Sequence, residues 1–315
     1  MDVLLRCVVL SLAAFGVTHL LASGLVAFRG TDDPQDQSPA DRADRLLRSQ
    51  VLPTATAALV LLFAAVSLFR FESRDGNEVI GRGLWMAATL GASLLLLIVW
   101  RLARMRRQTS RLLRTWLADA SPVGLRDVTF PAVAINTGFP VVAVIGVLRP
   151  QLVIDVQVLR ACSDDELAAI LAHERGHVCR WDNLRRTVVT AVPGPWFSRD
   201  LPEAWRQATE EAADDQAAAT THDARFHLAT ALLRVSRLAP ATDERSDWHH
   251  QLPASALYRG ESVEQRVRRL VDAPPPIPRV RRHWTSAIAA LMLVAAFALQ
   301  RELHIVMEQV IAFLP

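Results

Sequence analysis

Near its middle the chain reads His173-Glu174-Arg175-Gly176-His177. On an α-helix, two imidazoles four residues apart share one face, about one turn apart. Two histidines in this pattern, with a carboxylate after the first, are typical of a catalytic zinc site. The pentapeptide therefore predicts a helix that carries two metal ligands, His173 and His177, and a general base, Glu174.

The residues before the pentapeptide predict where this helix begins. Ser163-Asp164-Asp165-Glu166 has the pattern of a capping box and places acidic groups at the positive end of the helix. Apolar residues then recur at helical spacing, at Leu167, Ile170, Leu171 and Val178. Both histidines are therefore expected well inside the helix.

A second helix, rich in acidic residues, is predicted from about Leu201 to Ala219, after the interruption at Pro193-Gly194-Pro195. A catalytic zinc needs three protein ligands and one open position for water, and Glu210 would be the third ligand. Asp214, one turn further along, would accept a hydrogen bond from the other ring nitrogen of His173 and so orient it. Glu211 and Asp215 have the same spacing, so the sequence leaves the register between Glu210 and Glu211 open.

The part that precedes the capped helix is predicted to be β structure. Residues 128–135 and 140–148 are rich in Val and Ile, Asn136-Thr137-Gly138 between them has hairpin turn chemistry, and residues 151–156 again resemble a strand. Strands followed by helices, the last at 225–238 and 262–271, indicate an α+β domain. The strand at 141–148 is either a plain core strand or an edge strand that holds the substrate backbone.

The apolar residues, which belong to a 51% hydrophobic chain of 315 residues, are strongly clustered. Four clusters are close to the roughly 20 residues that cross a bilayer: 8–28, 51–69, 83–100 and the shorter 284–299. Buried core helices are the alternative. The sequence predicts three transmembrane helices within residues 1–103, a zinc metallopeptidase domain at 104–283, and a fourth transmembrane helix with a short tail at 284–315.

Arginines predict the orientation of these helices. They follow the third cluster and precede the fourth, at Arg101, Arg104, Arg106, Arg107, Arg111, Arg114, Arg279, Arg281 and Arg282. Because cytoplasmic loops carry the excess of positive charge, the zinc domain is expected in the cytoplasm and the N-terminus outside. The formal charge of +3 lies in these flanks, where anionic lipid headgroups are a more usual partner than nucleic acid. No nucleic-acid partner is expected.

Three cysteines, Cys7, Cys162 and Cys179, do not suggest a disulfide framework. Cys179 lies two residues past His177 and so faces away from it on a helix. It is predicted to be a packing residue rather than a ligand.

Residues 171–184 resemble the active-site helix of the BlaR/MecR-type membrane metallopeptidases, the antirepressor proteases of β-lactam sensing. Residues 146–154 are similar to that family's preceding segment, and 210–215 to its third-ligand segment. The resemblance implies a gluzincin-like α+β zinc domain inserted in an α-helical membrane protein of the bacterial cytoplasmic membrane. It also implies one Zn²⁺ per chain on His173, His177 and Glu210, with Glu174 as the base and a protein substrate such as a repressor.

Two departures from that family limit what can be carried over. The receptors have a penicillin-binding sensor domain after the fourth helix, whereas this chain ends at Pro315, so no antibiotic sensing is expected. Trp181 stands where an Arg is expected before Asp182.

Two other functions remain open. The HtpX-type membrane quality-control proteases share the same metal logic, and a zinc-domain receptor or scaffold could signal by binding without cleavage. The presence of Glu174 favours a peptidase. Such an enzyme also needs a group that stabilises the oxyanion, for which the candidates are Tyr258, His249 and His250.

Overall fold

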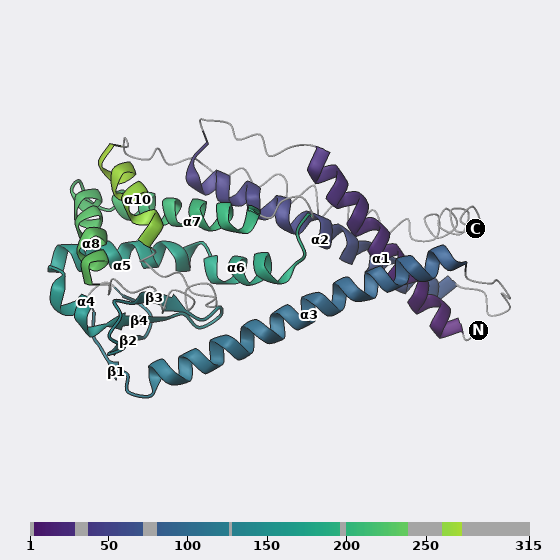
Figure 1. Cartoon of the computed structure of the whole chain (residues 1–315), viewed down its shortest axis with the longest axis horizontal. Coiled ribbons are helices and arrows are strands. Elements are labelled where there is room, and N and C mark those ends of the chain that lie inside the picture. Colours follow the sequence, from purple (N-terminus) through teal and green to yellow (C-terminus); the bar gives the residue numbers. More distant parts are fainter. Residues whose placement is uncertain are drawn as a thin grey trace.

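The structure is a computed structural model, and it describes residues 3–28, 37–71, 81–125, 128–195, 200–238 and 260–272. The molecule is elongated (Figure 1). Three long helices, α1 (Val3–Phe28), α2 (Pro39–Phe71) and α3 (Arg82–Leu117), cross one another at one end. A small sheet and the remaining helices form the other end, which we call the sheet-containing region.

Within the described residues, three helices are long and apolar enough to cross a membrane: Leu4–Phe28, Pro39–Leu68 and Arg82–Leu117. Helices α1, α2 and α3 contain the first three predicted spans, and each is longer than its prediction. Their outer faces expose large apolar side chains, such as Leu25, Met86 and Leu96, as expected of helices that face lipid. The predicted fourth span at 284–299 lies outside the described residues.

Close backbone contact between α1 and α3 depends on two glycines. A Cβ atom at Gly91 would lie 2.1 Å from the Leu12 carbonyl oxygen, and one at Gly16 would lie 2.6 Å from that of Ala87. Small residues that let backbones approach are the usual means of helix association in lipid, where no hydrophobic effect drives it.

Helices α2 and α3 also extend into the sheet-containing region. The first turns of α2 pack through Ala43 and Leu46 against α6 (Asp182–Ala191) and α7 (Leu201–Ala218). The last turns of α3 bring Trp116 against the sheet. The predicted domain boundaries at 103/104 and 283/284 stay a prediction, but both helices pack into the sheet-containing region.

The turn that follows α6 is bound by side chains of all three long helices. Gln50 Nε2 donates to the carbonyl oxygens of Val189 and Val192, each at 3.2 Å. Arg101 donates to Val192, while Thr54 donates to Pro193 and His19 Nε2 lies 3.3 Å from the Pro193 oxygen. A Cβ atom at Gly194 would lie 2.2 Å from Gln50 Oε1, so the turn fits closely against α2.

Four strands, β1 (Ser121–Pro122), β2 (Ala132–Ile135), β3 (Val142–Ile145) and β4 (Gln151–Asp155), form one sheet in the order β1-β2-β4-β3. β2 runs parallel to β4, and the other neighbours are antiparallel.

The predicted hairpin through residues 136–138 is therefore wrong, because β4 lies between β2 and β3. Asp155 at the end of β4 accepts hydrogen bonds from the Thr137 backbone nitrogen and hydroxyl, at 2.9 and 3.1 Å, and so holds this turn as a crossover. The real hairpin joins β3 to β4 through Gly146, whose φ of 91° favours glycine.

The helices that follow are α4 (Val156–Ala161), α5 (Asp164–Cys179), α6, α7, α8 (Ala224–Leu238) and α10 (Gly260–Asp272). α5, α7, α8 and α10 agree closely with their predicted positions, whereas α4 and α6 were not predicted. The capping box of α5 is confirmed, because Ser163 and Glu166 bond reciprocally. Apolar residues of α5, α8 and α10 pack with β3 and β4 in one core, which fixes α5 beside the sheet.

Candidate metal and catalytic site

His173 and His177 lie on one face of α5, as the sequence predicts. Their Nε2 atoms are 3.1 Å apart, and both side chains are almost completely buried. Helix α7 packs against this part of α5 at Gly176, where a Cβ atom would lie 3.2 Å from Gln216 Oε1 and 3.5 Å from the Ala213 Cα. This packing places the acidic segment of α7 against the histidines.

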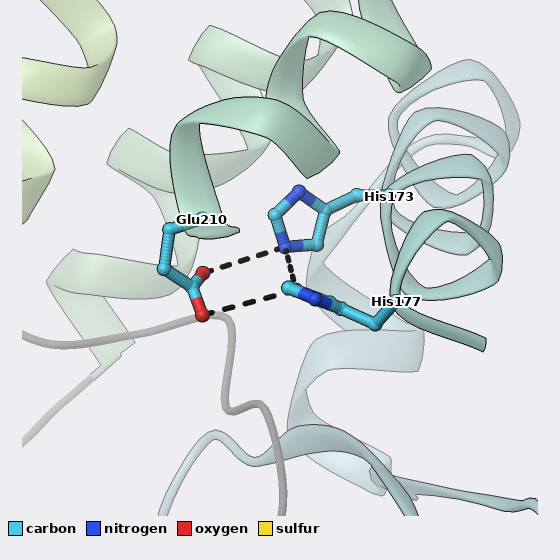
Figure 2. Close-up of side chains that lie close together, drawn as sticks. All are labelled: His173, His177 and Glu210. Atoms are coloured by element: carbon cyan, nitrogen blue, oxygen red, sulfur yellow. Dashed lines mark hydrogen bonds and ion pairs between the residues drawn. The ribbon is translucent and has the colours of Figure 1, made fainter. Parts of the chain in front are cut away.

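Glu210, and not Glu211, is the glutamate that α7 presents to this pair (Figure 2). Its Oε2 is 3.6 Å from His173 Nε2 and its Oε1 is 3.8 Å from His177 Nε2. Glu211 instead accepts a hydrogen bond from Gln207 and lies 3.9 Å from Arg42 of α2. Of the two registers that the sequence left open, the structure therefore has the one in which Glu210 faces the histidines.

A carboxylate faces the other nitrogen of His173. Asp214 Oδ1 lies 2.9 Å from His173 Nδ1, in the pairing that the sequence predicts. Arg266 of α10 donates to both oxygens of Asp214, at 2.8 and 2.7 Å, and its Nη1 is 3.4 Å from Glu210 Oε2. The sequence analysis did not find Arg266.

A second aspartate faces His177. Asp182 Oδ2 lies 2.8 Å from His177 Nδ1 and also accepts from Arg180 Nη2 at 2.5 Å. Trp181, which lies between Arg180 and Asp182 in the sequence, has a left-handed backbone conformation, with φ 58° and ψ 35°, and turns the chain back from α5 into α6. The sequence analysis gave Asp182 no role. A carboxylate placed just past the end of the helix, within reach of its last histidine, is the signal that could have identified it.

The two aspartates fix the histidine tautomers. Since each Nδ1 faces a carboxylate, the hydrogen belongs on Nδ1, and both Nε2 atoms carry lone pairs that point toward each other. Glu210 adds a carboxylate whose buried Oε2 makes no hydrogen bond within the described residues and has an ion pair with Arg266 at 3.4 Å. Three electron-pair donors therefore converge on one point, which is the arrangement that holds a metal cation.

The spacing of these donors suits a metal ion. One ligand atom from each of His173, His177 and Glu210 lies within 4.8 Å of the others. In a tetrahedral zinc site with bonds of about 2.0–2.2 Å, ligand atoms are separated by about 3.3 Å. The contacts of 3.1, 3.6 and 3.8 Å bracket this separation. Two imidazoles and a carboxylate are also a donor set that zinc commonly takes.

Charges around the site keep its carboxylates ionised. Burial disfavours the charged form of Glu210, but His177, His173 and Arg266 outweigh burial and hold its pKa well below the ordinary value. Burial acts likewise on Asp214, where Arg266 and His173 lower the pKa to about 2. For His173, burial opposes protonation, but Asp214 and Glu210 outweigh it and raise the pKa. The net environment favours positive charge.

Glu174 lies beside the sheet, completely buried. Its Oε2 accepts a hydrogen bond from the Val144 backbone nitrogen at 3.1 Å. Asn183 donates to the carbonyl oxygens of Val144 and Gly146, at 3.0 and 2.9 Å. β3 is thus an edge strand of the described sheet. The backbone N–H and C=O groups of Val144 already form hydrogen bonds with Glu174 and Asn183. This argues against a substrate backbone at that residue.

Four other residues were considered from the sequence. Tyr258, His249 and His250 fall outside the described residues, and their roles stay predictions. Cys179 is exposed on the surface of α5, so its interpretation as a packing residue is wrong.

Comparison with known proteins gives one family. The family model described as BlaR1 peptidase M56 matches residues 80–259, more than half of the chain. The matched range contains His173, Glu174, His177 and Glu210, but ends before α10 and Arg266. A search of curated proteins found no match.

Proposed function

The chain belongs to the BlaR1 peptidase M56 family, and on that basis we propose that it is a membrane-anchored zinc endopeptidase. The observation that carries the proposal is the convergence of His173, His177 and Glu210, with a buried glutamate, Glu174, next to the first histidine. A non-cleaving zinc domain would need the metal ligands but not this glutamate.

His173, His177 and Glu210 would hold one Zn²⁺ and leave a position open. When bound, zinc polarises a carbonyl group and lowers the pKa of water toward about 7. Glu174 is the proposed general base. Its carboxylate follows a ligand residue, is shielded from solvent, and is oriented by the Val144 backbone nitrogen. Asp214 and Asp182 keep the hydrogens on Nδ1 of the histidines, so that both Nε2 atoms stay available.

The proposed location is the bacterial cytoplasmic membrane, with the sheet-containing region in the cytoplasm. The start of α2 and the end of α3 both lie at that end of the molecule (Figure 1). Arginines are concentrated there, at Arg42, Arg45 and Arg48 of α2 and at Arg104, Arg106, Arg107, Arg111 and Arg114 of α3. The positive-inside rule supports the cytoplasmic side for such loops.

The proposed substrate is a protein at or near that membrane surface. The resemblance to antirepressor proteases suggests a regulatory repressor as a specific candidate.

Replacement of the general base tests the proposal. In Glu174→Gln we expect a loss of cleavage of about 100-fold or more, because a general base contributes about 10²–10⁴-fold. Zinc content should stay at one per chain, since Glu174 is not a ligand. The measurement compares protein fragments in cells that produce wild-type or Glu174→Gln protein, together with metal analysis of both purified full-length chains.

Glu264→Gln on α10 is the matched control, because Glu264 is exposed and pairs only with Arg268 in the described structure. It should give the wild-type fragments. Identical fragments from wild-type and Glu174→Gln cells would refute catalysis by this site. Wild-type chains without stoichiometric zinc would refute the metal site itself.

A further inference from the structure

Helix α10 reaches α7 with two arginines that are one turn apart. Arg266 bonds Asp214, while Arg269 pairs with Asp215 and donates to the Glu211 carbonyl oxygen at 3.2 Å. The Arg266 side chain is 4% exposed and the Arg269 side chain is 25% exposed. The two arginines therefore contact adjacent acidic residues, but only Arg266 is on the side of the histidines.

The contact between Arg266 and Asp214 fixes the orientation of the carboxylate. The guanidinium group donates to both Asp214 oxygens, and this two-point contact prevents the carboxylate from rotating. Because Oδ1 is also the atom 2.9 Å from His173 Nδ1, the orientation of that imidazole depends on the same contact. A third nitrogen, Nη1, lies 3.4 Å from Glu210 Oε2.

The buried charge of Arg266 also depends on the carboxylates around it. A buried guanidinium is costly to remove from water and persists only with charged partners around it. Asp214, Glu210 and Glu174 are the carboxylates that stabilise it. Arg266 thus offsets repulsion among three acidic side chains that must lie together before a cation binds.

We infer that Arg266 is a positioning residue, which presents Asp214 to His173 and Glu210 to the metal position. The inference rests on the proposed function, since it assumes that these residues hold zinc. It adds a third helix to the site: α5 supplies the histidines, α7 the carboxylates, and α10 the arginine that aligns them. This helix lies beyond the range that the family model matches.

Arg266→Lys is the decisive variant. Arg269→Lys is its matched control, because both arginines lie on α10 and contact α7. Lysine keeps the buried charge but is a point charge that cannot make the two-point contact. We expect Arg266→Lys to bind zinc about 10–100-fold more weakly, as is usual when a residue behind a metal ligand is changed. Arg269→Lys should keep the wild-type affinity.

The measurement uses Zn²⁺ itself, in competition with a chromophoric chelator, on the full-length chain in detergent micelles. Circular dichroism of the same samples reports folding. The visible spectrum of the Co²⁺-substituted protein gives a second readout, and we expect it to change for Arg266→Lys because the ligands are displaced, and not for Arg269→Lys.

Each outcome decides the inference. Equal zinc affinity and an unchanged Co²⁺ spectrum in folded Arg266→Lys would overturn it, as would an equal loss in Arg269→Lys. An unfolded Arg266→Lys chain would assign Arg266 to stability alone and also overturn it. A wild-type chain that binds zinc but cleaves nothing would refute the proposed peptidase and leave the inference intact.

Discussion

His173 and His177 are each backed by an aspartate that is bonded to an arginine, but the two supports are built differently. For His177, Arg180 lies at the end of α5 and Asp182 at the start of α6, and both are within five residues of the histidine. For His173, Asp214 comes from α7, and Arg266 from α10 is 52 residues further along. The first support needs one helix corner, whereas the second needs three packed helices.

The two supports also differ in how far their side chains are buried. The side chains of Asp214 and Arg266 are 1% and 4% exposed, against 5% and 16% for Asp182 and Arg180. Arg180 also donates to the Thr209 carbonyl oxygen of α7 at 2.7 Å, so the local support contacts α7 one residue before Glu210. Of the two histidines, His173 therefore has the support that depends more on the assembled fold.

The largest effect is expected for Asp214→Asn. This change leaves the charge of Arg266 buried without its main partner, and breaking such a pair costs about 3–5 kcal/mol in the free energy of unfolding. Zinc binding should weaken in the folded protein too. Urea unfolding of the full-length chain in micelles measures the first effect, and chelator competition measures the second. A loss no greater than that in Asp182→Asn would show that the two supports are equivalent.

Asp182→Asn should have a smaller effect on stability, about 1–3 kcal/mol, since Arg180 keeps the Thr209 contact and some access to solvent. Its effect on zinc should remain large, about 10-fold or more, because the amide can donate to His177 Nδ1 and move the hydrogen to Nε2. The same two measurements apply. Unchanged zinc affinity would mean that Asp182 does not set the tautomer of His177.

The smallest effect is expected for Trp181→Asn, at the corner that forms the local support. Trp181 is 54% exposed and has a left-handed backbone, which costs a residue with a Cβ atom about 1–2 kcal/mol. Asn tolerates this conformation, so we expect a gain of up to about 1 kcal/mol and unchanged zinc affinity. A lower midpoint of thermal unfolding would show that the indole contacts outweigh the strain.

The parts of the site that follow from helical spacing could be predicted, whereas Asp182 and Arg266 were missed. The capped helix and the shared face of His173 and His177 follow from spacing along one helix, and so does the four-residue offset of Glu210 and Asp214. Arg266 has no such signal. Every basic residue among the 35 in this chain is arginine, and Arg266, Arg268 and Arg269 differ only in which side of α10 meets α7.

The sheet shows the same limit. The composition of the strands indicated β structure, and the turn chemistry of Asn136-Thr137-Gly138 suggested a hairpin. In the structure β4 lies between the two strands that flank this turn, and Asp155 at the end of β4 accepts a hydrogen bond from the turn. A single sequence does not reveal such a contact, because it depends on where β4 lies relative to both of its neighbours.

The turn after α6, which Gln50, Thr54, His19 and Arg101 bind, has a mechanical consequence. Hydrogen bonds from three long helices to one turn restrict how the sheet-containing region can move relative to those helices. Under the proposed function, the metal position would then stay at one distance from the bilayer. A protein substrate would have to present its scissile bond at that distance, so the distance from the membrane would contribute to substrate selection.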